Sequence, residues 1–150
     1  MDLIAVDPLQ RDEATIQSLE TLWERSVRAT HTFLKEADIA ELRDLVPEYL
    51  RSIPYLAISM SNGTVAGFLG IDGDKLEMLF IDPDFRGCGI GRTMMRHAAE
   101  RGVLFVDVNE QNEQAVGFYL HLGCSVISRS EVDSQGNPFP LLHLRLPSCS

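Results

Sequence analysis

The glycine-rich segment 82–92 is the feature that most constrains the fold of this chain. It places Gly87, Gly89 and Gly91 at alternate positions, after an apolar strand-like run that ends at Ile81 and at the start of a helix-like run over residues 90–101. Glycine allows tight turns and close approach of the backbone, and the first N–H groups of a helix have no partner within it. The segment therefore predicts a strand–loop–helix unit with free donors at the helix start.

An anionic group is the expected ligand of this unit. A helix N-terminus attracts anions, and Arg86 and Arg92 add positive charge. A dinucleotide-binding fingerprint would require glycine where Arg92 stands, and the chain contains no Gly-Lys-Ser or Gly-Lys-Thr of a P-loop. A loop that only turns tightly remains the alternative.

Hydrophobic periodicity predicts the other elements. Apolar residues recur at helical spacing over residues 16–27 and 39–53, and a further helix is expected over 112–121. Strand-like runs occupy residues 3–6, 55–60, 65–71, 76–81, 104–108, 124–132 and 141–146. Turn signals separate several consecutive strands, so the order predicts an α+β fold with a mostly antiparallel sheet.

Length and composition favour a globular protein. The chain has 150 residues, of which 45% are apolar, so we expect one domain over residues 1–150. Its apolar runs are far shorter than the roughly 20 residues of a membrane span. The start at residues 1–4 lacks the basic and apolar regions of a signal peptide. We therefore expect a cytoplasmic protein that does not bind membranes.

Charge and cysteine content argue against several functions. The net charge of -9, with no basic cluster, makes nucleic acid a poor partner and a cationic amine a plausible one. Cys88, Cys124 and Cys149 are an odd number without metal-ligand spacing. We expect three reduced thiols and no metal site.

Segment 86–91 resembles the signature of the GNAT acetyltransferases, in which Gln or Arg is followed by two residues, Gly, one residue, and Gly or Ala. Arg86, Gly89 and Gly91 match it. The resemblance implies a GNAT-like fold with a mixed, mostly antiparallel sheet of about seven strands flanked by about four helices. It also implies that the loop binds the pyrophosphate of acetyl-CoA through Arg86, Gly87, Cys88, Gly89, Ile90, Gly91 and Arg92.

The same resemblance implies a role for the strand before the loop. Leu79, Phe80 and Ile81 would pair through their backbone with the pantetheine arm. An N–H group near Leu79 or Phe80 would then polarise the thioester carbonyl, as an oxyanion-type donor.

A second motif, at residues 112–119, resembles the family's asparagine-alanine-aromatic-tyrosine helix. Asn112 and Tyr119 lie seven residues apart, so they face the same side of a helix after about two turns. By resemblance Asn112 and Phe118 bind the cofactor, and Tyr119 is the general acid that protonates the departing thiolate. A helix N-cap for Asn112 and a half-buried packing role for Tyr119 are the alternatives.

Two carboxylates qualify as the general base. Strand alternation places Glu77 on the same face as Leu79 and Ile81, and Asp107 corresponds to an acid on the fifth strand of some amine-modifying relatives. Either could instead be a solvated or ion-paired strand residue. Deprotonation of the substrate through water would require neither.

The resemblance places the acceptor between the end of the first helix and the final hairpin, where the expected substrate-binding residues are His31, Phe33, Glu131, Asp133 and Phe139. Carboxylates and aromatic faces suit an ammonium group. Segments 26–34, 80–91, 108–119 and 129–142 further resemble a bacterial peptidyl-lysine acetyltransferase, which indicates a protein lysine acceptor. A small-molecule amine or amino-acid acetyltransferase and a non-catalytic acetyl-CoA-binding module remain alternatives, as do a monomer and a homodimer.

Overall fold

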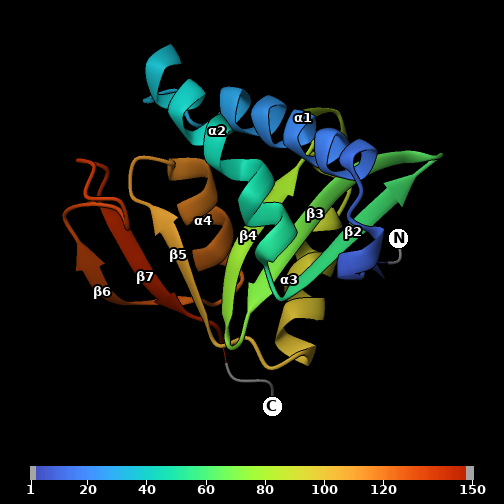
Figure 1. The fold of residues 1–150 in the computed structure, drawn as a ribbon. Helices are drawn as coiled ribbons and strands as arrows, with labels where there is room; N and C mark the ends of the chain where they lie inside the picture. The colour runs from blue at the N-terminus through green and yellow to red at the C-terminus, as the bar shows by residue number, and fades with distance from the viewer. Residues whose placement is uncertain (1–2, 148–150) are drawn as a thin grey trace.

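A seven-stranded sheet of order β1-β2-β3-β4-β5-β7-β6 organises residues 3–147, which are the residues that the computed structural model describes (Figure 1). The strands are β1 (Leu3–Ala5), β2 (Tyr55–Ser61), β3 (Thr64–Asp72), β4 (Lys75–Ile81), β5 (Phe105–Asn109), β6 (Ser125–Ser130) and β7 (Leu141–Arg145). Only β4 and β5 pair in parallel; the other neighbouring strands are antiparallel. The predicted α+β class and mostly antiparallel sheet are confirmed.

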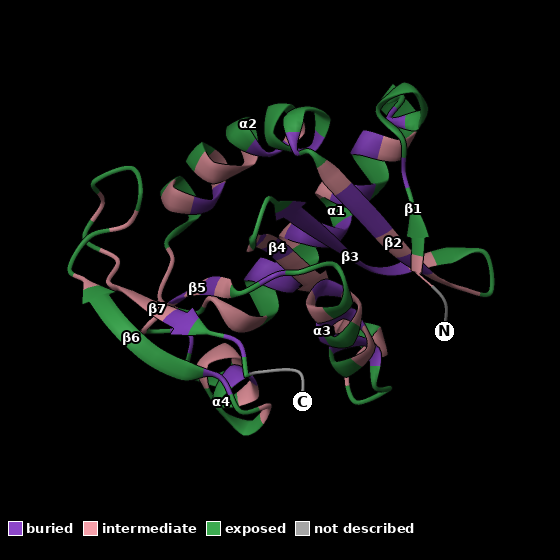
Figure 2. Cartoon of the chain, turned by 90° about the horizontal axis from the view of Figure 1, so that it is seen from below, coloured by how far each residue is buried: buried purple, intermediate pink, exposed green. Residues whose placement is uncertain are grey.

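Helices cover both faces of the sheet. The α-helices are α1 (Glu13–Thr30), α2 (Glu36–Ser52), α3 (Ile90–Glu100) and α4 (Glu113–His121), with short 3-10 turns η1 (Pro8–Gln10) and η2 (Pro83–Phe85). Helices α1 and α2 pack on one face around a core that includes Trp23, Leu50 and Phe68, whereas α3 packs on the other around Met94 and Leu144. Figure 2 shows the buried residues concentrated in the central strands, while β6 at the edge is largely exposed.

Sheet pairing between β4 and β5 ends early. Only Lys75 with Phe105 and Leu76 with Val106 are paired among the described residues, and beyond them the two strands diverge. The rest of β4 pairs with β3 on one side alone. The sheet thus contains an internal opening whose edge consists of unpaired β4 backbone.

A β-bulge interrupts the alternation of β4 at Glu77. The register between β3 and β4 shifts by one residue here and leaves Glu77 without a Cα partner in β3. A bulge re-aims side chains by breaking the two-residue period of a strand. Glu77 consequently faces Tyr49 of α2, whose hydroxyl lies 3.5 Å from its carboxylate, while Leu79 and Ile81 pack toward the α3 side. The prediction that these three residues share a face is therefore wrong.

Two of the three cysteines lie within the residues that the structure describes. Cys88 and Cys124 are free thiols, and Cys149 lies outside the described residues, as do Met1 and Asp2. Over residues 3–147, none of the helices is long and apolar enough to cross a membrane.

Arg11 ties the N-terminal segment to the end of α2. Arg11 as a whole residue is 8% exposed; its Nε donates to the carbonyl of Val6, and its Nη1 donates to carbonyls at the end of α2, including that of Ile53 at 2.6 Å. The last carbonyls of a helix have no intrahelical donor. Arg11 therefore satisfies groups that would otherwise be buried without a partner.

We predict that Arg11→Met lowers the free energy of unfolding by roughly 2–4 kcal/mol, because the substitution strips buried carbonyls of their donor. Arg51→Met is the matched control, since Arg51 is 43% exposed and only forms a surface ion pair with Glu13, worth up to about 1 kcal/mol. Urea unfolding of both variants provides the measurement. Equal destabilisation by the two substitutions would contradict the role assigned to Arg11.

Candidate functional site

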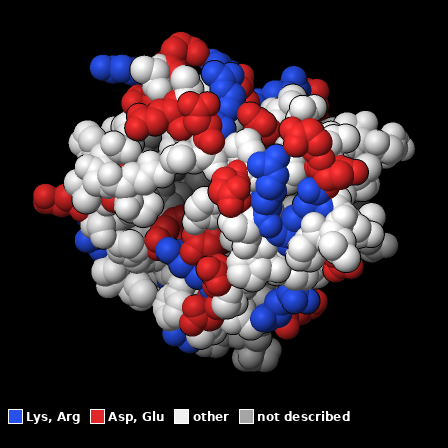
Figure 3. All heavy atoms as spheres, viewed as in Figure 1, with Lys and Arg blue, Asp and Glu red and all other residues white. Residues whose placement is uncertain are grey.

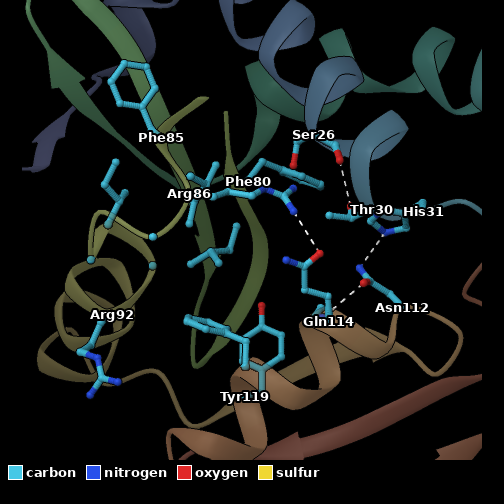
Figure 4. A pocket seen from close by; sticks show the side chains of 18 residues that line it. Ser26, Thr30, His31, Phe80, Phe85, Arg86, Arg92, Asn112, Gln114 and Tyr119 are labelled. Atoms are coloured by element: carbon cyan, nitrogen blue, oxygen red, sulfur yellow. Dashed lines mark hydrogen bonds between the residues drawn. The ribbon is translucent and has the colours of Figure 1, made fainter. Parts of the chain in front are cut away.

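A cavity of about 330 Å³, here called the main cleft, lies between the end of β4, the start of α3 and one side of α4, below the last turn of α1 (Figure 4). The residues predicted for cofactor binding or catalysis that line it are Leu79, Phe80, Ile81, Arg86, Gly87, Gly89, Ile90, Gly91, Arg92, Asn112, Phe118 and Tyr119. Cys88 is exposed and is not among the lining residues. The sequence motifs are thus brought together around one cavity.

The three loop glycines serve two different purposes. Gly87 and Gly89 have φ angles of 77° and 82°, in the left-handed region that favours glycine, and Gly89 is the N-cap of α3. A side chain at Gly91 would instead approach the ring of Phe118 to 2.9 Å. The first two glycines therefore shape the open loop, while the third permits close packing of α3 against α4.

The electrostatics of the main cleft favour an anion near the loop. Arg86 reaches the cleft and donates to the side-chain oxygen of Gln114 at 3.1 Å, and burial lowers the pKa of its guanidinium. Arg92 also lines the cleft, but its side chain extends away from Tyr119 (Figure 4). Arg86 and the N-terminal N–H groups of α3 thus place positive charge at one end of the cleft.

Tyr119 lies at the other end of the main cleft. It is 6% exposed, and its hydroxyl points into the cavity (Figure 4). Burial raises the pKa of this phenol above its ordinary value, and Cys124 raises it further. The hydroxyl is therefore protonated at neutral pH, as a proton donor must be.

Asn112 both caps a helix and contacts the cleft. Its Oδ1 accepts the N–H of Ala115 at 3.2 Å, which leaves Nδ2 to donate to Nε2 of His31 at 3.3 Å. The other ring nitrogen of His31 lies 2.9 Å from the hydroxyl of Thr30, which itself donates to the carbonyl of Ser26. This chain fits a neutral imidazole that carries its proton on Nδ1. Burial and the charge of Arg86 lower the pKa of His31 to about 4, in agreement with the neutral form.

A second cavity of about 120 Å³, here called the chamber, occupies the opening between β4 and β5. Tyr119 lines both the chamber and the main cleft, and the two candidate bases Glu77 and Asp107 also line the chamber. The two cavities therefore meet at the proposed proton donor.

The two candidate bases differ in their surroundings. Asp107 lies 2.7 Å from Nζ of Lys75 and 2.6 Å from Nδ1 of His143. Although burial acts to raise the pKa of Asp107, the hydrogen bonds from Lys75 and His143 bring it below its ordinary value. Glu77 has looser contacts, at 3.5 Å to Tyr49 and 3.7 Å to Lys75. Glu77 is consequently the more loosely held of the two carboxylates.

A third cavity of about 300 Å³, here called the side cavity, lies between α1, α2 and the β6–β7 loop. The ring of Phe33 is 5.4 Å from that of His31 and 5.9 Å from that of Phe139, so aromatic contacts join the α1–α2 turn to the loop. Asp133 also lines the side cavity. Glu131 is exposed and lies outside the lining residues of the three cavities.

Sequence reasoning missed several lining residues. Ser26, Phe85 and Gln114 line the main cleft, and Tyr49 lines the side cavity. Gln114 had a usable signal, because it lies in the first turn of the motif helix beside Asn112. Phe85 lies within the glycine-rich segment and Ser26 begins segment 26–34, whereas Tyr49 comes from a helix that carries no motif. Within residues 3–147, no group of three or more His, Cys, Asp or Glu side chains is arranged to hold a metal ion.

Comparison with known proteins agrees with this site. The family model described as "Acetyltransferase (GNAT) family" matches residues 16–124. The chain is 46% identical to Peptidyl-lysine N-acetyltransferase YjaB of Escherichia coli (strain K12) over 129 residues, which cover 85% of this chain and 88% of YjaB. It is also 46% identical over 132 residues to YjaB of Salmonella typhimurium, with coverage of 87% and 91%. The resemblance to a bacterial peptidyl-lysine acetyltransferase is confirmed.

Solved structures support the same assignment. The solution structure of apo-form YjaB from Escherichia coli aligns with a TM-score of 0.84 and 40% identity, covering 99% of this chain and 100% of that one. The PaiA N-acetyltransferase of Thermoplasma acidophilum, solved in complex with coenzyme A, shares the fold with a TM-score of 0.68 at 19% identity, covering 95% and 98%. The GNAT fold is thus confirmed, and the chain belongs to the GNAT family of acetyltransferases as an N-acetyltransferase.

Proposed function

We propose that this protein transfers the acetyl group of acetyl-CoA to the side-chain amine of lysine in a polypeptide, by direct attack, with Tyr119 as general acid. The observation that carries the proposal is the position of Tyr119 at the meeting point of the main cleft and the chamber. The name of the two relatives at 46% identity supports lysine as the acceptor.

The main cleft fits acetyl-CoA. Gly87 and Gly89 present backbone without side chains, the first N–H groups of α3 are free donors, and Arg86 adds a cation for the pyrophosphate. The unpaired backbone of β4 at residues 79–81 suits an extended, amide-containing arm. Bound there, acetyl-CoA supplies an activated acetyl thioester. An N–H near Leu79 or Phe80 is then placed to polarise its carbonyl.

The chamber fits the acceptor amine. Glu77 attracts the ammonium group and takes up its proton, directly or through water, because its carboxylate is only loosely held. Asp107 stays paired with Lys75 and His143 and maintains the electrostatics of the chamber. Tyr119 holds the proton that a departing thiolate requires. These roles divide the proton transfers between two residues that both line the chamber.

A small-molecule amine is the second candidate acceptor. The side cavity favours it, since about 300 Å³ of mostly apolar space beside the chamber could enclose the body of such a molecule. A non-catalytic acetyl-CoA-binding module is less well supported, because a binding role would not require the Tyr119 hydroxyl to point into the cavity.

We predict that Gly89→Val weakens acetyl-CoA binding at least tenfold, because Gly89 lines the main cleft and valine is strained at its φ of 82°, so the loop would change shape. Gly73→Val is the matched control, since Gly73 has a φ of 61° in the β3–β4 turn, away from the cleft. Calorimetric titration of both folded variants with acetyl-CoA measures the effect. Unchanged affinity in Gly89→Val would remove the loop from the cofactor site.

We predict that the protein acetylates a lysine-containing peptide and that Tyr119→Phe lowers kcat by roughly 100- to 10,000-fold, the usual contribution of a general acid. The affinity for acetyl-CoA should stay within about twofold, since only a hydroxyl is removed. Release of free thiol and mass spectrometry of the peptide follow the reaction. Turnover at the parent rate on every accepted amine would reduce Tyr119 to a packing residue, and acetylation of small amines alone would favour the second candidate.

We predict that Glu77→Gln lowers kcat/KM for the peptide about 100-fold at pH 7, and that Asp107→Asn lowers it less. The loss in Glu77→Gln should shrink near pH 10, where more of the lysine amine, with a pKa of about 10.4, is already neutral. A pH profile of kcat/KM for both variants tests the assignment. A larger loss in Asp107→Asn, restored at high pH, would make Asp107 the base.

A further inference from the structure

The side cavity combines an apolar interior with an acidic border. Buried apolar side chains form its interior, among them Trp23, Val46 and Met78. At its border Leu45 and Tyr49 of α2 remain 44% and 48% exposed. Large apolar side chains that stay exposed around a cavity of this size are typical of a binding site rather than of a fully packed core.

The charges around the side cavity are of one sign. Glu77 and Asp133 line it, and no lysine or arginine is among its lining residues within the described part of the chain. Lys75, the cation nearest to Glu77, is already paired with Asp107 at 2.7 Å. Acidic side chains also gather on α2 and around the hollow beside it (Figure 3). The cavity therefore complements a ligand that is apolar in one part and cationic in an adjacent part.

The side cavity adjoins the chamber. The residues that line both are His31, Glu77, Met78, Phe80 and Asn109. An ammonium group held by Glu77 thus lies at the border between the two cavities. Neighbouring residues of a peptide have Cα atoms about 3.8 Å apart, so a residue next to an acceptor lysine would begin within reach of the side cavity.

We infer that the side cavity binds a large apolar side chain, aliphatic or aromatic, that neighbours the target lysine in the acceptor polypeptide. This inference rests on the proposed function and adds a sequence preference to it. The four-methylene chain of lysine is slender, whereas a cavity of about 300 Å³ has room for a separate side chain. Burial of such a group in the side cavity also favours binding, since it removes apolar surface from water.

The test compares peptides that differ at one residue beside a single lysine. Acetyl-Gly-Xaa-Lys-Gly-amide and acetyl-Gly-Lys-Xaa-Gly-amide are prepared with Ala, Leu or Phe as Xaa, and 2-phenylethylamine serves as a small apolar amine. In at least one of the two series, the Leu and Phe peptides should exceed the Ala peptide roughly tenfold or more in kcat/KM, as expected for burial of such a side chain.

Leu45→Trp then narrows the cavity at a half-exposed helix position, where folding should tolerate the change. It should abolish the preference for Leu and Phe while leaving the Ala peptide within about threefold of the parent. Ile4→Trp is the control, because Ile4 is 52% exposed on β1, at the opposite end of the sheet from the hairpin, and it should retain the preference. Melting temperature and acetyl-CoA affinity confirm that both variants are folded.

The outcomes separate the inference from the proposed function. Acetylation of all peptides with equal kcat/KM would overturn the inference and leave lysine acetylation intact. A preference that survives in Leu45→Trp would also overturn it, because the side cavity would not be its source. Acetylation of 2-phenylethylamine but of no peptide would overturn the proposed function and the inference together.

Discussion

The incomplete pairing of β4 with β5 is the constraint on which the rest of the site depends. Two neighbouring strands in a sheet normally share backbone hydrogen bonds along their length, yet here the ladder stops at Leu76 and Val106. The divergence creates the chamber and exposes the backbone of residues 79–81 on one side. Unpaired backbone groups away from water are costly, so such an edge is stable only if water or a ligand satisfies it. The opening therefore provides the volume of the chamber and leaves the backbone groups of residues 79–81 available to pair with an extended partner.

The bulge at Glu77 adds a second local break that serves the same region. After the bulge the ordinary alternation of β4 resumes, so that Met78 and Phe80 join the core beneath α1 and α2, while Leu79 and Ile81 face the α3 side. The bulge turns Glu77 toward Tyr49 of α2 and the side cavity. In a strand without the bulge, Glu77 would lie on the same face as Leu79 and Ile81, which is the face toward α3. Irregular backbone next to a catalytic site is a recurrent device for aiming one side chain.

Local signals explain what could be predicted from the sequence. Periodicity, turn residues and the loop glycines predicted the strands, the helices and the strand–loop–helix unit, because each of these features depends on neighbours in sequence. The N-cap role of Asn112 was foreseen for the same reason. The residues of the main cleft were predicted from the resemblance to the GNAT signature and to the family's second motif. Gly91 was predicted to bind the cofactor; it lines the main cleft, and the structure adds a close packing against Phe118, which involves a helix far along the chain.

Contacts between distant segments explain what could not be predicted. The pairing of Asp107 with Lys75 and His143, and that of His31 with Asn112, join residues from separate elements. Neither periodicity nor a short motif reports such contacts. The bulge at Glu77 likewise depends on the register with β3, which a single strand does not encode. The choice between the two candidate bases therefore required the three-dimensional arrangement.

The position of β7 affects the order in which the lining residues of the main cleft and of the side cavity become available during synthesis. Every residue that lines the main cleft lies between Ser26 and Tyr119, whereas the side cavity also needs Asp133, Phe139 and Leu141. Strand β7 inserts between β5 and β6, so the backbone groups along this edge of β5 have no β7 partner until that later segment emerges from the ribosome. A nascent chain therefore contains every lining residue of the main cleft before it contains those of the side cavity. The side cavity is thus the last of the three cavities whose lining residues are all synthesised.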